Sequence, residues 1–135
     1  MNKPKRWQYI KDRVREHPRH TIIGSVLFLT GLNFMLNDSY FFWPPYMARA
    51  LNDDILGFSA MIISFWMVHW VLQKERSIKV NRGLLMASAA FFAFDATAEL
   101  LHGFVGHGPH MYTAAIADAG LLAIVLVMAR IGQKN

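Results

Sequence analysis

The sequence contains no cysteine among its 135 residues, which excludes disulfide bonds, thiol nucleophiles and cysteine-ligated metal sites. It also has no nucleotide or haem motif, and no serine in an elbow-type turn near its acidic residues. The cofactor therefore stays unknown, with a cation as the one candidate. On these absences the sequence favours a protein that is not an enzyme.

Charged residues are also few, at 17% of the chain, and they are almost missing from four apolar runs. These runs cover residues 21–36, 55–72, 83–101 and 111–129, each about long enough to cross a bilayer. A soluble four-helix bundle would need a polar stripe along each helix, and residues 55–72 offer only two serines, a glycine and a histidine. We predict an all-α, polytopic membrane protein whose four transmembrane helices form one antiparallel bundle over residues 21–135.

Basic residues lie on one side of this four-span arrangement. Thirteen of the fourteen lysines and arginines fall within residues 1–20, 73–82 and 130–135, and only Arg49 falls in the loop of residues 37–54. The positive-inside rule then places both termini in the cytoplasm and the chain in the plasma or inner membrane. Attraction to the anionic inner leaflet explains the net charge of +5, so we expect the lipid bilayer as a partner and no nucleic acid.

Two segments outside the spans have recognisable patterns. Residues 1–20 form a basic amphipathic segment, predicted to be a cytoplasmic helix on the membrane surface that ends at Pro18. The outer loop is rich in aromatic residues around two prolines, and we expect it to lie along the outer surface with a short helix over residues 45–51. Its Trp43 and Tyr46 are candidates for a binding lip over a cavity.

Polar residues interrupt the third and fourth spans in a pattern that predicts a site. Asp95, Glu99 and His102 lie at i, i+4 and i+7, so they share one face of a helix. Folding the short hairpin about a centre near residue 106 brings Asp118 level with Asp95, and Asn33 of the first span reaches the same layer. The sequence therefore predicts a buried layer of acids, His102 and Asn33 in the outer half of the bilayer.

Ionised carboxylates are costly inside a membrane, and these two spans contain no lysine or arginine to neutralise them. Protons, metal or alkali ions, imidazolium or a cationic ligand remain as the positive species. Glu99, His102, His107 and His110 could also form a metal site of zinc type at the outer hairpin. A third interpretation is a hydrogen-bond network that fixes helix register without a ligand.

The leading functional hypothesis is a small membrane protein that binds or conducts protons or cations. Four helices rarely enclose a full transport path alone, so conduction implies a homo-oligomer. Three alternatives remain open on the sequence: a permeabilising protein resembling phage holins, a metal-dependent membrane enzyme, and an accessory or scaffold subunit that uses the aromatic loop.

Overall fold

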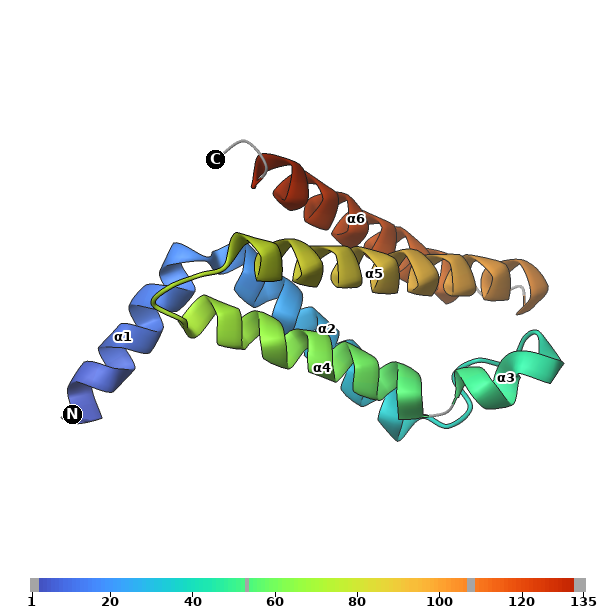
Figure 1. Ribbon diagram of the computed structural model, residues 1–135. Helices are drawn as coiled ribbons and strands as arrows, with labels where there is room; N and C mark the ends of the chain where they lie inside the picture. The colour runs from blue at the N-terminus through green and yellow to red at the C-terminus, as the bar shows by residue number, and fades with distance from the viewer. Residues whose placement is uncertain (1–2, 53, 107–108, 133–135) are drawn as a thin grey trace.

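The computed structural model describes residues 3–52, 54–106 and 109–132, and these residues form six helices and no strand. Four of the helices are long: α2 (Pro18–Leu36), α4 (Asp54–Leu72), α5 (Ile78–Gly106) and α6 (Pro109–Ile131). The shorter ones are α1 (Lys3–Glu16) at the start of the chain and α3 (Pro45–Leu51) between α2 and α4. Figure 1 shows their order and arrangement. The prediction of an all-α protein is confirmed over the described residues.

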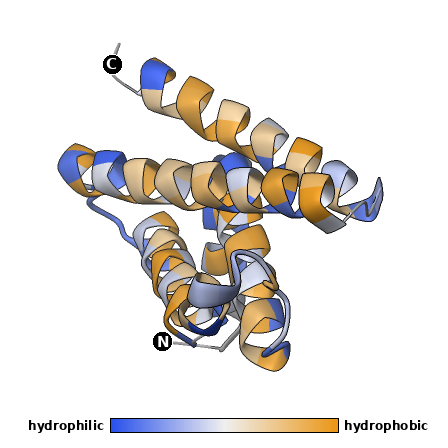
Figure 2. Ribbon diagram, turned by 90° about the vertical axis from the view of Figure 1, so that its right-hand side faces the viewer, coloured by the Kyte–Doolittle hydropathy of each residue, from blue (hydrophilic) through white to orange (hydrophobic). Residues whose placement is uncertain are grey.

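The four long helices are long and apolar enough to span a membrane. Hydrophobic residues make up most of these helices, as the colours in Figure 2 show, and many of their large apolar side chains are exposed. Leu29, Phe65 and Ile116, for example, are 63%, 67% and 73% exposed. Water-soluble proteins seldom expose apolar surface on this scale, whereas lipid solvates it. The helices therefore indicate a multi-pass membrane protein.

The third spanning helix is longer than the sequence pattern predicts. We expect a span over residues 83–101, but α5 has 29 residues and continues to Gly106. At 1.5 Å per residue it is about 44 Å long, which exceeds a hydrocarbon core of about 30 Å. Its extra turns at both ends are therefore helix rather than loop. His102 consequently lies inside this helix, beyond the predicted end of the span at residue 101.

The long helices pack as two close antiparallel pairs, α2 with α4 and α5 with α6, joined where α4 meets α5. Small residues allow the first pair to approach closely, because a methyl group on Gly31 would lie 2.5 Å from the Gly57 carbonyl oxygen. The Ser64 hydroxyl also donates a hydrogen bond of 2.6 Å to the Gly24 carbonyl oxygen across the same interface. Helix α6 packs mainly on α5 and diverges from it towards its C-terminal end (Figure 1).

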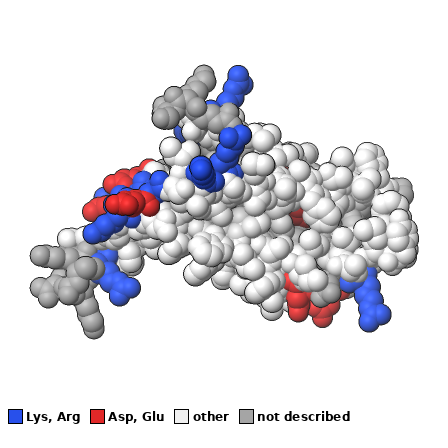
Figure 3. Space-filling model, in the orientation of Figure 1, with Lys and Arg blue, Asp and Glu red and all other residues white. Residues whose placement is uncertain are grey.

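Charged side chains mark the two ends of the molecule. Helix α1, the α4–α5 connection and the C-terminal end of α6 lie at one end, and α3 lies at the other (Figure 1). Charged side chains gather at these two ends, and the broad middle shows only a small acidic spot on the face in Figure 3. The predicted short helix over residues 45–51 is confirmed as α3, and the N-terminal helix ends at Glu16, just before Pro18.

Candidate functional site

Three carboxylates from two helices form a cluster at the centre of the candidate site. Asp95 and Glu99 lie one turn apart on α5, and Asp118 faces them from α6. One oxygen from each lies within 4.8 Å of the others. The short α5–α6 connection sets this register. The two helices fold back on each other about a centre near residue 106, which brings Asp118 level with Asp95, as the sequence predicts.

Burial makes this cluster chemically unusual. Asp95 and Glu99 are 1% and 3% exposed, while Asp118 is half-buried. One oxygen of each buried acid, Asp95 Oδ1 and Glu99 Oε2, has no hydrogen-bond partner among the described residues. Buried polar atoms are nearly always paired, so two orphaned carboxylate oxygens in one cluster call for a positive species or a donor.

The aromatic loop, residues 37–44 between α2 and α3, closes the cluster on the side nearer α3. The Tyr40 hydroxyl donates a hydrogen bond to Glu99 Oε1. Burial and this contact with Glu99 raise the pKa of Tyr40 above its ordinary value, so the hydroxyl stays a neutral donor. The next residue, Phe41, is 2% exposed, and its ring packs edge-on against Phe34 of α2 at 5.3 Å. The loop is therefore folded inward at this point.

Two side chains hold the aromatic loop in this position. Asn52 pairs with the Phe41 backbone in both directions, with bonds of 2.8 Å and 2.7 Å. His102 is buried on α5, and its Nδ1 lies 2.6 Å from the Ala98 carbonyl oxygen. Its Nε2 accepts the backbone N–H groups of Phe42 and Trp43, each at 3.2 Å. His102 thus ties the loop to α5.

Of the histidines predicted to lie at the α5–α6 hairpin, His102 lies on α5 and His110 on α6. His102 uses both ring nitrogens within the fold, and His110 is exposed in the first turn of α6. His107 lies outside the described residues. The carboxylates that come together are Asp95, Glu99 and Asp118, and among the described residues neither His102 nor His110 joins them.

A pocket of about 270 Å³ lies against the carboxylate cluster, between α2, α5, α6 and the aromatic loop. Thr30 and Asn33 line it from α2, as the predicted polar layer requires of Asn33. The Asn33 side-chain oxygen also accepts a hydrogen bond of 2.9 Å from Asn37. Among the described residues no lysine or arginine lines this pocket.

The pocket presents only oxygen-bearing polar groups: carboxylates, a phenol, a carboxamide and a hydroxyl. Such oxygen sets suit hard cations, Na⁺, Mg²⁺, Ca²⁺ or Mn²⁺, better than soft ones, which prefer sulfur or imidazole. The arrangement can also hold a proton shared between carboxylates. It offers neither a nucleophile beside a base nor a set of donors aimed at a developing oxyanion.

Sequence reasoning missed the most important loop residue. The pattern singles out Trp43 and Tyr46, but Tyr46 is 84% exposed and Trp43 is half-buried, and neither lines this pocket. Tyr40 contacts the acids instead, although it lies 59 residues from Glu99 in the chain. No periodicity in the loop marks it, since the contact depends on how the loop folds back.

Comparisons of the chain with known protein families, with curated proteins and with solved structures found no match. The function of the site is therefore argued from its own chemistry.

Proposed function

We propose that this membrane protein binds a positive species, a hard cation or a proton, at the carboxylate cluster of Asp95, Glu99 and Asp118. The observation that carries the proposal is the pair of buried, unpartnered oxygens on Asp95 and Glu99 beside an oxygen-lined pocket. Tyr40 closes the site and donates to Glu99, Asn33 supplies a carboxamide oxygen at the rim, and His102 positions the loop that carries Tyr40.

The cost of the cluster supports a functional role. A single ionised carboxylate inside a bilayer costs about 2.5–3.5 kcal/mol on insertion scales, and three in contact also repel one another. A network that only fixed helix register would be cheaper with neutral amides and hydroxyls. A bound cation or proton lowers both the burial cost and the repulsion.

Binding is the role that one chain can perform. On the basic side of Asp95, the buried face of α5 continues with Phe92, Ser88 and Leu85, all at most 2% exposed. Along α5, within the described residues, this packed, mostly apolar stretch offers no polar path past the cluster. Conduction of the bound species would accordingly require a homo-oligomer whose interfaces complete the path.

The proposed orientation follows from charge. Both termini and the α4–α5 connection belong at the cytoplasmic side of a plasma or inner membrane, against its anionic leaflet. The carboxylate pocket then faces the outer half of the bilayer, beneath the aromatic loop. Fusing a reporter that is active only in the cytoplasm to each terminus tests this, and a signal from neither terminus would reverse the orientation.

Calorimetry on the purified chain in micelles tests the binding, with Na⁺, Mg²⁺, Ca²⁺ and Mn²⁺ titrated separately and the pH varied for the proton. We expect Asp95→Asn to lose the binding. Asp54→Asn, an exposed acid at the first residue of α4, is the matched control and should retain it. Equal binding by both variants would place the ion elsewhere. Flux measurements on the same variants in liposomes would then separate binding from passage.

A further inference from the structure

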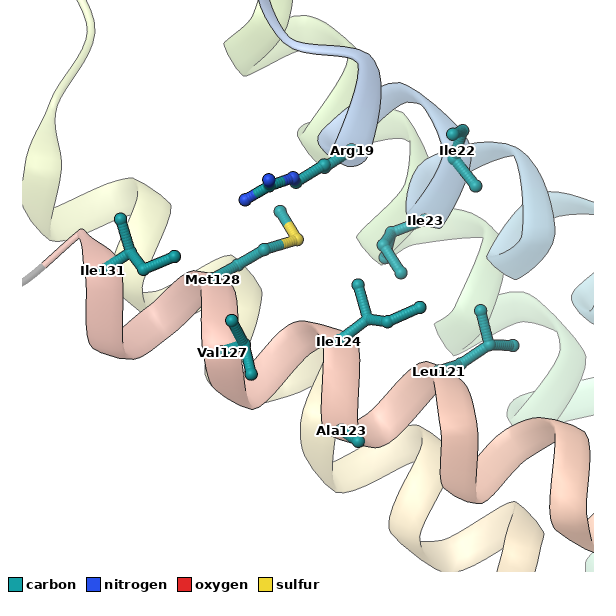
Figure 4. Close-up of a pocket in the computed structure, with 9 residues that line it drawn as sticks. All are labelled: Arg19, Ile22, Ile23, Leu121, Ala123, Ile124, Val127, Met128 and Ile131. Carbon is teal, nitrogen blue, oxygen red and sulfur yellow. The ribbon is translucent and has the colours of Figure 1, made fainter.

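A second hollow lies on the opposite side of the membrane from the carboxylate pocket. Helix α6 leans away from α2 and leaves a groove of about 520 Å³ between them, which we call the α2–α6 groove. Ile22 and Ile23 line it from α2, and Ile124, Val127 and Met128 line it from α6. Figure 4 shows Ile23 of α2 and Ile124 and Met128 of α6 directed into the space between the two helices. In a bilayer this groove meets lipid from the side.

A polar pocket of about 400 Å³ adjoins the groove at its basic end. The two hollows share Arg19, Met128 and Ile131, so one molecule can occupy both. His20 and Asn81 line the polar pocket and hydrogen bond to each other, with 2.8 Å between Nε2 and Oδ1. The combined hollow is therefore amphipathic, with a polar end and a long apolar end.

The charge at the polar end suits an anion. Arg19 extends over the groove towards α6 in Figure 4, and it forms no ion pair with a carboxylate among the described residues. The one acid that lines the pocket, Glu16, is already paired with Arg13 at 2.8 Å and Arg76 at 3.1 Å. A free guanidinium binds phosphate oxygens in a bidentate geometry.

The position in the membrane fits as well. Arg19 lies in the first turn of α2, where the helix dipole adds to the attraction for an anion. Basic side chains gather at this end of the molecule in Figure 3, and a basic end attracts anionic headgroups. The groove then runs from headgroup depth into the hydrocarbon, as an acyl chain does.

We propose that an anionic phospholipid occupies this hollow, with its phosphate on Arg19 in the polar pocket and an acyl chain in the α2–α6 groove. The lipid would fill the gap that α6 leaves open and would hold α6 against α2. This site is separate from the carboxylate pocket and does not depend on the function proposed for it.

Native mass spectrometry of the full chain released from mixed micelles tests the proposal. We expect phosphatidylglycerol to remain bound and phosphatidylcholine to be lost, and Arg19→Gln to weaken phosphatidylglycerol binding about tenfold. Arg49→Gln, an exposed basic residue on α3 at the other end, is the matched control and should bind as the wild type does. Equal retention of the two lipids, or undiminished binding by Arg19→Gln, would overturn the proposal.

A second variant tests the apolar half without changing charge. Ile124→Trp fills the groove and should displace the lipid, whereas Ile116→Trp adds the same bulk at a 73% exposed position and should not. Circular dichroism checks that both variants keep their helices. Displacement of the lipid by inorganic phosphate alone would mean an anion site without a chain. Dimers in place of lipid adducts, lost in Ile124→Trp, would mean that a second copy fills the groove; either result would overturn the proposal.

Discussion

At the scale of single residues, the Tyr40 hydroxyl is the only neutral donor seen on the carboxylate cluster within the described part of the chain. It satisfies Glu99 Oε1, while Glu99 Oε2 remains without a partner. Hydrogen bonds to charged groups contribute more than neutral ones, and a buried acceptor that loses its donor is costly. Tyr40 therefore contributes both to the stability of the loop and to the chemistry of the carboxylate cluster.

We predict that Tyr40→Phe lowers the free energy of unfolding by about 1–3 kcal/mol, because Glu99 Oε1 loses its donor while the ring still fills its place. Denaturant titration in mixed micelles measures the effect. Tyr46→Phe removes the same hydroxyl from a side chain that is 84% exposed and should change nothing. A Tyr40→Phe variant as stable as Tyr46→Phe would show that the hydrogen bond contributes nothing.

Sequence periodicity was sufficient to predict that the three acids lie together, but it did not predict the loop contacts that surround them. Helical spacing and hairpin register bring Asp95, Glu99 and Asp118 together, because α5 and α6 are consecutive helices that form one hairpin. The contacts of Tyr40 and His102 depend on how an irregular loop folds back over α5, which no spacing rule describes. His102 accordingly anchors the loop, where the sequence alone suggests an ion support or a metal ligand.

At the scale of helices, the α2–α4 interface depends on the absence of side chains. A methyl group on Gly31 would meet the Gly57 carbonyl oxygen at 2.5 Å and Met61 Cγ at 2.9 Å. Gly120 on α6 has no atom within 4 Å of the corresponding position. Replacing each glycine with alanine therefore distinguishes the effect on helix packing, at Gly31, from the effect of helix propensity alone, at Gly120.

We predict that Gly31→Ala lowers the free energy of unfolding by about 1–3 kcal/mol, because the helices must move apart. Gly120→Ala should leave stability unchanged or raise it by up to about 1 kcal/mol, since alanine is the better helix former. Denaturant titrations of the two variants side by side decide the matter. Equal effects would mean that α2 and α4 do not pack through this contact.

The joint between α1, α2 and the α4–α5 connection carries a pH-sensitive contact. Arg76 donates to His17 Nε2, so His17 must be neutral at that nitrogen. Burial, and then the charge of Arg76, lower the pKa of His17 below its ordinary 6.5. Folding therefore favours the neutral ring. The contribution of His17 to stability is complete above pH 6.5 and is lost as the pH falls through its lowered pKa.

We predict that hydrogen exchange in residues 73–77, corrected for its intrinsic pH dependence, becomes faster as the pH falls below 6.5 and through the lowered pKa of His17. The His17→Gln variant should abolish this acceleration. The His20→Gln variant should keep it, which separates the two neighbouring rings at 5.8 Å. Glu16 does not interfere, because Arg76 and Arg13 lower its pKa below 4.5. An unchanged acceleration in His17→Gln would contradict this account.

The helix boundaries agree with the sequence prediction where a proline marks them. Pro18 and Pro45 each begin a helix, as a residue with no N–H to satisfy can. Helix α5 extended beyond the predicted residues 83–101 because polar composition marks where the bilayer ends, not where the helix does. Within a membrane protein these two boundaries can differ by more than a turn.

At the scale of the whole molecule, three of the four long apolar helices, α2, α5 and α6, line a polar layer that opens between α2 and α6. Hydropathy and charge predicted the number of spans, since the bilayer imposes that length on any spanning helix. The short hairpin predicted that α6 packs on α5, but neither hydropathy nor charge predicted that α6 would stand away from α2. That choice depends on side-chain fit, and it leaves the carboxylate pocket and the α2–α6 groove along one seam.

The central claim is that the carboxylate cluster takes up a positive species, and infrared difference spectroscopy of the carboxyl groups tests it most directly. We predict that adding a hard cation, or changing the pH, alters the bands of buried carboxyl groups in the wild-type protein. Those changes should be missing in Asp95→Asn and present in Asp54→Asn. Carboxyl bands that respond to neither titration, or that respond equally in Asp95→Asn, would contradict the claim.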